Sequence, residues 1–145
     1  MKFVRPVNTH GKPAKVSNTY SWYHKGIDYA YPEGETIFAS ETGYVLRIVS
    51  SYKNCWRNLL KLTTADYGNF IIIQHHYGYQ TYYTHLRPGT ILVKQGQQVS
   101  KGQPIAQEGK TGNTGCGAHL HYELRQYNKQ VNPIPLMDLK FTGYK

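Results

Sequence analysis

Two histidines stand one residue apart late in the sequence, in the segment HLHYEL (119–124). In a β-strand, residues i and i+2 project to the same face. His119, His121 and Glu123 would then share one face, while the Leu, Tyr and Leu between and after them would face a core. Two neighbouring imidazoles can ligate one metal ion, or one can ligate while the other acts as an acid or base. The alternative is a solvated strand face that happens to carry histidines.

A second pair of candidate ligands lies upstream, where HKGID places His24 and Asp28 four residues apart. Gly26 and the IDYAY run that follows it favour a loop leading into a strand over a helix. In either conformation one imidazole and one carboxylate can converge, and both groups suit Zn²⁺. Taken alone, such a pair is more often a surface ion pair or a hydrogen bond.

Together these residues have the composition of a catalytic zinc site, in which three protein ligands leave a fourth position open to water. His24, Asp28 and one histidine of the 119–124 segment would supply the three ligands. The other histidine of that segment and His85 would be left for proton transfer or oxyanion stabilisation. The spacing does not decide which of the two histidines binds the metal.

Short strands separated by glycine-containing turns must position these side chains, which is the spacing typical of a mainly β fold with little helix. The apolar and alternating runs predict strands at 36–39, 43–49, 69–75, 81–86, 91–93, 103–107 and 119–125. The segment 51–67 breaks this rhythm, because Trp56, Leu59 and Leu60 stand at i, i+3 and i+4, which fits a short helix or a packed loop. We interpret 51–67 as an insertion between two strands.

The composition limits the class of protein. A chain of 145 residues predicts a single domain over 1–145. No apolar run approaches the ~18 residues that a spanning helix needs, so we expect no membrane insertion. The scattered Gly and Pro residues exclude a coiled coil. The first ten residues are not followed by the apolar segment of a secretory signal peptide, so we expect none in this chain.

The charge is strongly basic, with a formal net charge of +9 and a pI of about 9.5. A basic surface attracts polyanions, among them the anionic polymers of a bacterial envelope. The sequence has no block of like charges and no RNA-binding aromatic signature, so we expect no nucleic acid partner. Cys55 and Cys116 fit one disulfide or two free thiols equally well, and without a CxxC pair a thiolate zinc knuckle is not expected.

Six motifs occur in a fixed order: HKGID, GNFIIIQH, YYTHL, GQQVSKGQPIAQEGKTGNTG, HLHYEL and VNP. From about His24 to Pro133 the sequence resembles the lysostaphin-like, LytM-type zinc metallopeptidases of bacterial cell walls. This resemblance implies an antiparallel β-sheet crossed by a groove, and one zinc ion per chain. It also implies peptidoglycan as the partner, with hydrolysis of a peptide bond in its cross-bridges or stems.

The resemblance also implies roles for individual residues. The zinc ligands would be His24, Asp28 and His121. The catalytic histidines would be His85 and His119, one as the base and the other as the oxyanion stabiliser. We favour His119 as the base, although the sequence does not decide between the two.

Further groove residues follow from positions near these motifs. Tyr83 would share a face with His85 if both lie in one strand, and Asn128 is a weaker candidate. We interpret His75 and His76 as a strand end near the surface. Cys116 stands where the family tends to have Ser/Thr-Gly-Pro, so it is either a packing residue or a fourth, thiolate ligand.

The main alternative is a catalytically inactive LytM-like module that binds the wall or regulates another protein. Such relatives typically lack zinc ligands, whereas all three ligands and both histidines are present here. A lipoyl- or biotin-carrier-like fold is a second alternative, but no carrier lysine stands in a suitable hairpin. We expect a monomer that works outside the cytoplasm, in the cell wall or periplasm, or that is associated with a phage.

Overall fold

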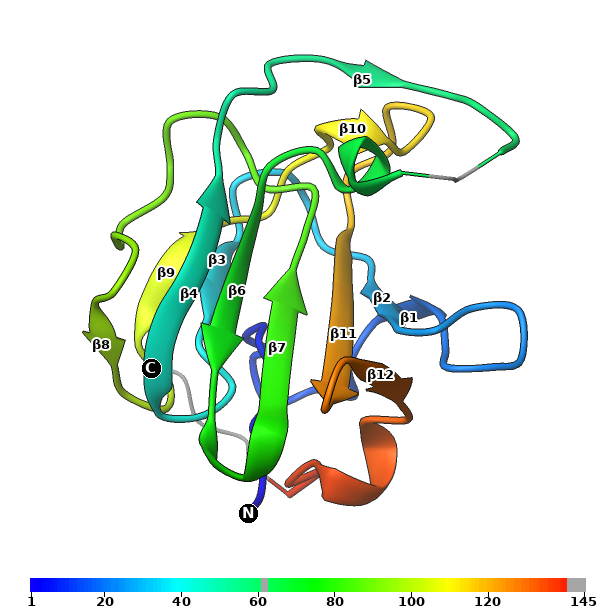
Figure 1. Cartoon of the computed structure of the whole chain (residues 1–145). Helices are drawn as coiled ribbons and strands as arrows, with labels where there is room; N and C mark the ends of the chain where they lie inside the picture. The colour runs from blue at the N-terminus through cyan, green and yellow to red at the C-terminus, as the bar shows by residue number, and fades with distance from the viewer. Residues whose placement is uncertain (61–62, 141–145) are drawn as a thin grey trace.

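An eight-stranded β-sheet forms the frame of the molecule in the computed structural model, which describes residues 1–60 and 63–140 (Figure 1). The strand order is β1-β2-β11-β7-β6-β4-β8, and β12 also pairs with β11. Every pair within this sheet is antiparallel, which confirms the mainly β, antiparallel fold class. The strands are β1 (Val16–Asn18), β2 (Ile27–Tyr29), β4 (Gly43–Val49), β6 (Phe70–Gln74), β7 (Tyr79–Tyr83), β8 (Gln98–Val99), β11 (Leu120–Gln126) and β12 (Lys129–Val131).

Two smaller sheets complete the β structure. Strands β3 (Thr36–Phe38) and β9 (Pro104–Gln107) pair antiparallel and lie behind β4 and β6 in the view of Figure 1. Strands β5 (Cys55–Trp56) and β10 (Gly112–Asn113) pair in parallel at the top of the same view. The first small sheet covers the core, and the second lies near the candidate site.

The core lies against one face of the main sheet. On β11 the side chains of Leu120, Tyr122 and Leu124 are fully buried, in line with the alternation of the sequence. They pack with Ile37 of β3 and Ile105 of β9 in one apolar cluster. Burying an aliphatic or aromatic side chain of this size contributes roughly 1.5–3 kcal/mol. The opposite face of β11 is therefore left to carry polar side chains.

One predicted strand is wrong. Residues 91–93 form no strand, although the Leu92 N–H donates to the Ile105 carbonyl at 2.9 Å. Val93 is buried while Leu92 is exposed, so the apolar run is an irregular connection that buries one side chain. A second predicted strand, 81–86, is shorter at its end than expected, because β7 stops at Tyr83 and His85 has a φ of 60°.

The segment 51–67 lies between β4 and β6, and the structure describes all of it except residues 61 and 62. It contains β5 and the short 3-10 helix η1 (Thr64–Tyr67). Of the two alternatives for this segment, a helix through Trp56, Leu59 and Leu60 is not found, because Trp56 belongs to β5, and both leucines are exposed rather than packed.

The remaining helical turns are η2 (His76–Gly78) and η3 (Ile134–Leu136), and no α-helix occurs in the described ranges 1–60 and 63–140. Within those ranges no helix has the length and apolar character to cross a membrane.

Candidate metal centre and active site

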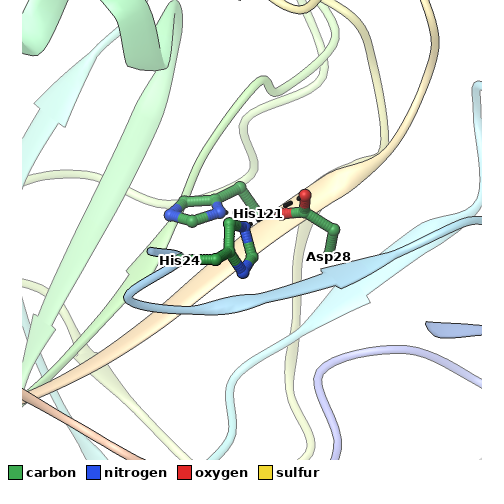
Figure 2. Close-up of side chains that lie close together, drawn as sticks. All are labelled: His24, Asp28 and His121. Carbon is green, nitrogen blue, oxygen red and sulfur yellow. Dashed lines mark hydrogen bonds and ion pairs between the residues drawn. The ribbon is translucent and has the colours of Figure 1, made fainter. Parts of the chain in front are cut away.

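His24, Asp28 and His121 converge on the open face of the main sheet (Figure 2). Asp28 lies directly opposite His121 in the β2–β11 pair. The Nε2 atom of His24 is 3.1 Å from Asp28 Oδ2, and the Nδ1 atom of His121 is 2.7 Å from Asp28 Oδ1. All three ligand atoms lie within 4.8 Å of one another. The structure thus brings together the three residues that were predicted to be metal ligands.

The strands explain why two of these side chains face the same way. Ile27 and Tyr29 are buried on either side of Asp28, so the alternation of β2 turns the carboxylate toward the open face. Gly26 makes the close approach possible. A Cβ atom at Gly26 would lie 2.7 Å from His121 Cε1, a contact that a side chain cannot make.

His24 is positioned by the loop between β1 and β2. Its Nδ1 atom donates to the Thr19 carbonyl at 3.0 Å, and its backbone N–H donates to Ser21 Oγ at 3.1 Å. Because Nδ1 donates to a carbonyl, Nε2 is the ring nitrogen that faces the Asp28 carboxylate. His24 therefore presents Nε2 as a donor atom for a metal.

Asp28 and His121 stabilise each other's charged forms. Burial opposes ionisation of Asp28, but its hydrogen bond to His121 and the charges of His121, His119 and His24 hold its pKa below the ordinary value. Burial likewise disfavours the protonated form of His121, but hydrogen bonds and charge attraction to Asp28 and Glu123 raise its pKa to about 9. An ionised carboxylate that faces two imidazole nitrogens is the donor chemistry that zinc prefers, so these residues fit the ion.

Glu123 lies next to the cluster, and its hydrogen-bond partners could not be predicted from the sequence. Its side chain is 1% exposed, and Oε2 accepts hydrogen bonds from His121 Nε2 at 2.8 Å and from the Tyr67 hydroxyl. Its Oε1 accepts from Arg125 Nη2 at 2.9 Å and from Gln130 Nε2 at 3.0 Å. Burial opposes ionisation, but these donors, His121 first, lower the pKa of Glu123 to about 2. The carboxylate therefore fixes the ring of His121 with Nδ1 toward Asp28.

The two remaining histidines, His85 and His119, lie beside this cluster. Their ring centroids are 4.7 Å apart, and His119 Nε2 is 4.0 Å from Asp28 Oδ2. His85 Nδ1 donates to the Thr111 carbonyl at 2.8 Å, and His119 Nδ1 donates to the Gly117 carbonyl at 3.1 Å. Both rings consequently keep Nε2 as the acceptor when neutral. Burial, together with His119 and His121, lowers the pKa of His85 to about 3, so this ring stays neutral at pH 7.

All five residues line one open cavity of about 400 Å³. The β1–β2 loop and the segment 51–67 supply its walls. The wall residues from these two segments are Tyr23, Lys25, Thr63, Thr64, Asp66 and Tyr67.

Tyr83 is not a groove residue, contrary to the prediction. It is fully buried, and its hydroxyl accepts hydrogen bonds from the Ser40 N–H at 2.9 Å and from Thr81 Oγ1 at 2.7 Å. The prediction assumed that Tyr83 and His85 lie in one strand. Because β7 ends at Tyr83 and the backbone turns at His85, their side chains lie on different sides.

Asn128 does not line this cavity. It is exposed, has a φ of 66°, and forms the turn between β11 and β12, outside the residues that line the cavity. His75 is buried rather than at the surface, with Nδ1 donating to the Thr42 carbonyl at 2.8 Å, while His76 is exposed as expected. Neither histidine lines the cavity.

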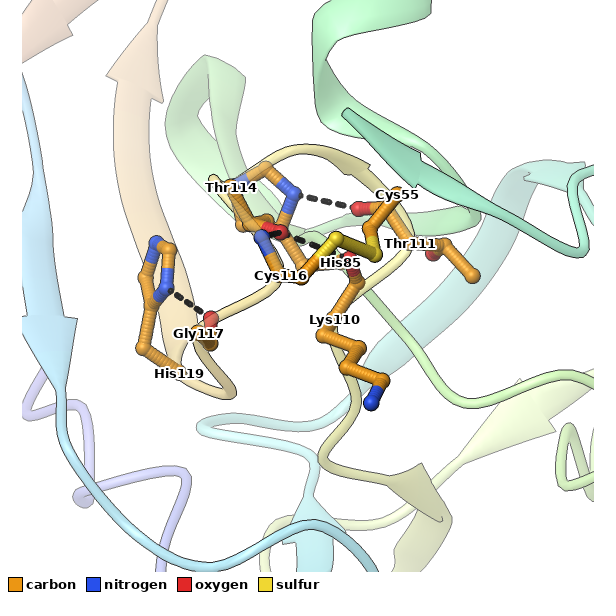
Figure 3. The surroundings of a disulfide bond; sticks show 8 residues. All are labelled: Cys55, His85, Lys110, Thr111, Thr114, Cys116, Gly117 and His119. Atoms are coloured by element: carbon orange, nitrogen blue, oxygen red, sulfur yellow. Dashed lines mark hydrogen bonds between the residues drawn. A yellow bond between two sulfur atoms is a disulfide. The ribbon is translucent and has the colours of Figure 1, made fainter. Parts of the chain in front are cut away.

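Cys116 is bonded to Cys55 in a disulfide, so it offers no thiolate to a metal (Figure 3). The sequence left open one disulfide or two free thiols. The structure shows the disulfide, and none of the described residues holds a free thiol.

The chain is similar to known proteins in sequence and in fold. Residues 22–133 match the profile of peptidase family M23. The chain is 38% identical over 111 residues to peptidoglycan DD-endopeptidase ShyA of Vibrio cholerae, covering 77% of this chain and 22% of that protein. It is 34% identical over 126 residues to murein hydrolase activator NlpD of Escherichia coli, covering 87% of this chain and 29% of that protein. The chain therefore spans less than a third of the length of these relatives.

Solved structures show the same fold. A zinc-containing peptidase from Vibrio cholerae superimposes with a TM-score of 0.74 at 28% identity, over 92% of this chain and 40% of that one. A mutant of the catalytic domain of the prophage-encoded M23 protein EnpA from Enterococcus faecalis gives 0.66 at 28% identity, over 89% of this chain and 95% of that one. The catalytic domain of lysostaphin from Staphylococcus simulans, at 23% identity, has a similar fold. The chain belongs to peptidase family M23, which confirms the resemblance to LytM-type enzymes.

Proposed function

We propose that this chain is a zinc-dependent endopeptidase that hydrolyses peptide cross-links of bacterial peptidoglycan. One observation carries the proposal: a donor set of His24, Asp28 and His121 and two further histidines share one open cavity. Three protein ligands leave room for water and substrate, as a hydrolytic zinc site requires. The peptidoglycan substrate is suggested by the name of the relative ShyA.

The metal would be held by His24 through Nε2, by Asp28 through its carboxylate and by His121 through Nδ1. When bound at such a site, zinc supplies a Lewis acid for the scissile carbonyl and lowers the pKa of water to about 7. Glu123 keeps the hydrogen of His121 on Nε2, and so leaves Nδ1 available to the metal.

His119 takes up the proton that the attacking water loses. Its Nδ1–H is engaged by the Gly117 carbonyl, so Nε2 is the basic atom, and this atom faces the Asp28 side of the cavity. General-base help of this kind contributes about two to four orders of magnitude to a rate.

For His85 we propose a role other than oxyanion stabilisation. An oxyanion stabiliser must donate a hydrogen bond, whereas neutral His85 has its hydrogen on Nδ1 and offers only an acceptor at Nε2. We assign to His85 the orientation of water or of a substrate N–H through this acceptor. His119, once protonated, is then the available donor to the oxyanion.

The alternative function is regulatory, and the similarity to the activator NlpD supports it. An inactive module would need neither zinc nor catalytic histidines. Here the complete donor set and both histidines favour the enzyme.

Zinc content and hydrolysis of a soluble cross-linked muropeptide test the proposal together. We expect one zinc per chain after dialysis, turnover that a chelator abolishes, and recovery on adding zinc. A protein that binds no zinc would contradict the proposal. A protein that shows no turnover but stimulates a separate murein hydrolase would instead be an activator.

The location and binding partners follow from the substrate. Peptidoglycan lies outside the cytoplasmic membrane, so we propose that the chain works there. The net charge of +9 suits attraction to anionic envelope polymers.

A further inference from the structure

The loop 110–118 connects the two catalytic histidines to the disulfide (Figure 3). Its Thr111 carbonyl accepts the hydrogen bond from His85 Nδ1, and its Gly117 carbonyl accepts the one from His119 Nδ1. Cys116 stands next to Gly117 and is bonded to Cys55. The conformation of this loop therefore sets the ring orientation of both histidines.

The two ends of the loop are held differently. Thr111 is buried, and its Oγ1 donates to the Leu86 carbonyl at 2.8 Å and accepts from the Asn69 N–H at 3.0 Å. This end is fixed by the core without help from the disulfide, and so is His85.

The other end is exposed, and Thr114 makes the hydrogen bonds within it. Thr114 Oγ1 donates to the Lys110 carbonyl at 2.7 Å and accepts from the Cys116 N–H at 3.1 Å, and the Thr114 carbonyl accepts from the Gly117 N–H at 3.3 Å. Gly115, Cys116 and Gly117 are all exposed, and Cys116 has a φ of 63°, a left-handed conformation that residues with a side chain rarely adopt. The Gly115 N–H donates to the Trp56 carbonyl at 2.8 Å. The disulfide is a second, covalent link between this end and the segment 51–67.

The segment 51–67 is itself held in place by strand pairing and by hydrogen bonds. Cys55 lies in β5, which pairs in parallel with β10. The Asn113 side chain also accepts from the Asn58 N–H at 2.8 Å and donates to the Asn58 carbonyl at 2.8 Å. A covalent bond to β5 therefore holds Cys116, and with it the neighbouring Gly117 carbonyl.

The metal ligands do not depend on this tie. Asp28 and His121 are paired in the main sheet, and His24 is held by its own loop through Thr19 and Ser21. Loss of the disulfide would therefore move His119 and leave the donor set in place.

We propose that Cys55 and Cys116 are positioning residues for His119, and that their disulfide holds the Gly117 carbonyl where it fixes the ring with Nε2 toward Asp28 and the candidate metal site. The proposal rests on the proposed function for its effect on turnover. Its effect on the ring of His119 does not depend on any activity.

The kinetic test compares Cys55→Ser, Cys116→Ser and the double variant with the wild type. A misplaced catalytic group costs up to about 100-fold, so we expect kcat to fall about 10- to 100-fold with KM within about twofold. Zinc should remain at one per chain. The double variant should match each single variant, because either change removes the same bond.

The structural test uses the imidazole nitrogen signals of His119 and His85 in NMR spectra. In the wild type we expect both neutral rings to carry the hydrogen on Nδ1. In the variants His119 should average between tautomers, while His85, held by Thr111, should not change and serves as the internal control. Cys55→Ala/Cys116→Gly provides a second variant, since glycine adopts a positive φ at position 116 without strain.

Reduction of the metal-free wild type with a phosphine gives the same readout without any substitution, should the variants fail to fold. His119 that keeps a single tautomer after the disulfide is broken would overturn the proposal. Unchanged kcat in a folded, zinc-loaded double variant would also overturn it. A wild type without peptidase activity would remove the proposed function, whereas the NMR comparison would still decide the positioning role.

Discussion

Asp28 Oδ1 lies 2.7 Å from His121 Nδ1, although the two residues are 93 positions apart in the sequence. They meet because β2 and β11 are neighbours and the register places one directly opposite the other. Two of the three proposed ligands thus sit on paired strands rather than on loops. Sites built on such elements are held more precisely than sites on loops alone.

Substitution of any proposed ligand should remove the metal. We expect His24→Ala, Asp28→Ala and His121→Ala each to lose stoichiometric zinc and all measurable hydrolysis, since each removes one of three ligands. Metal analysis of the dialysed variants checks this, with His76→Ala, an exposed histidine outside the cavity, as the matched control. Variants that keep one zinc per chain would disprove the ligand assignment.

Glu123→Gln should weaken zinc binding without removing a ligand. The amide has nearly the same shape but replaces one acceptor oxygen, so His121 Nε2 loses a firm partner. Loss of such a carboxylate typically costs about 10- to 100-fold in metal affinity. Competition with a chelator of known affinity measures the change. Gln130→Ala, which removes only one donor to Glu123, is the control and should change the affinity little.

His85→Ala and His119→Ala should separate the catalysts from the ligands. Both variants should keep about one zinc per chain, while turnover falls by about two to four orders of magnitude. Zinc analysis beside peptidase rates provides the check. If His119→Ala lost its zinc, both histidines of the 119–124 segment would be ligands, and Asp28 would orient one of them.

Glu108 is a buried acid outside the candidate site. It is fully buried, its Oε1 accepts from the Tyr31 N–H at 3.4 Å, and among the described residues Oε2 has no hydrogen-bond partner. Burial raises the pKa of Glu108 from 4.5 to about 8. Between these values the folded protein keeps a proton that the unfolded chain releases, so stability is full below pH 4.5 and is lost as pH rises through about 8.

Glu108→Gln should remove this pH dependence, because the amide does not ionise. The difference in unfolding free energy between variant and wild type should grow by up to roughly 1.4 kcal/mol per pH unit across the window. Urea unfolding from pH 4 to 9 measures it. Glu33→Gln, in a weak surface pair with Arg87, is the control. A difference that stays constant with pH would contradict the assignment.

The parts of the site that depend on local periodicity could be predicted from the sequence. His121 and the buried residues on either side of it follow the alternation of a strand, and β11 has that alternation. Tyr83 shows where the rule fails. The i, i+2 relation with His85 holds only while the strand continues, and a φ of 60° at His85 ends it.

Contacts between distant segments could not be predicted in the same way. Tyr67 donates to Glu123 across 56 positions, and Cys55 pairs with Cys116 across 61. Neither contact leaves a periodic pattern in the sequence, because each depends on how segment 51–67 folds over the site. The run at 91–93 has the apolar pattern of a strand for a related reason, since Ile91 and Val93 pack against the core without a neighbouring strand, while Leu92 is exposed.

The central claim is that this chain cleaves peptide cross-links with its own zinc site. The most direct measurement is mass spectrometry of the muropeptides left after purified sacculi are digested with the zinc-loaded protein. Sacculi with pentaglycine bridges and sacculi with direct diaminopimelate cross-links are compared, with His119→Ala as the control. We predict that in one type cross-linked dimers fall and monomers with new amino termini rise, and only with the wild type. Intact dimers in both types, with one zinc bound per chain, would contradict the account.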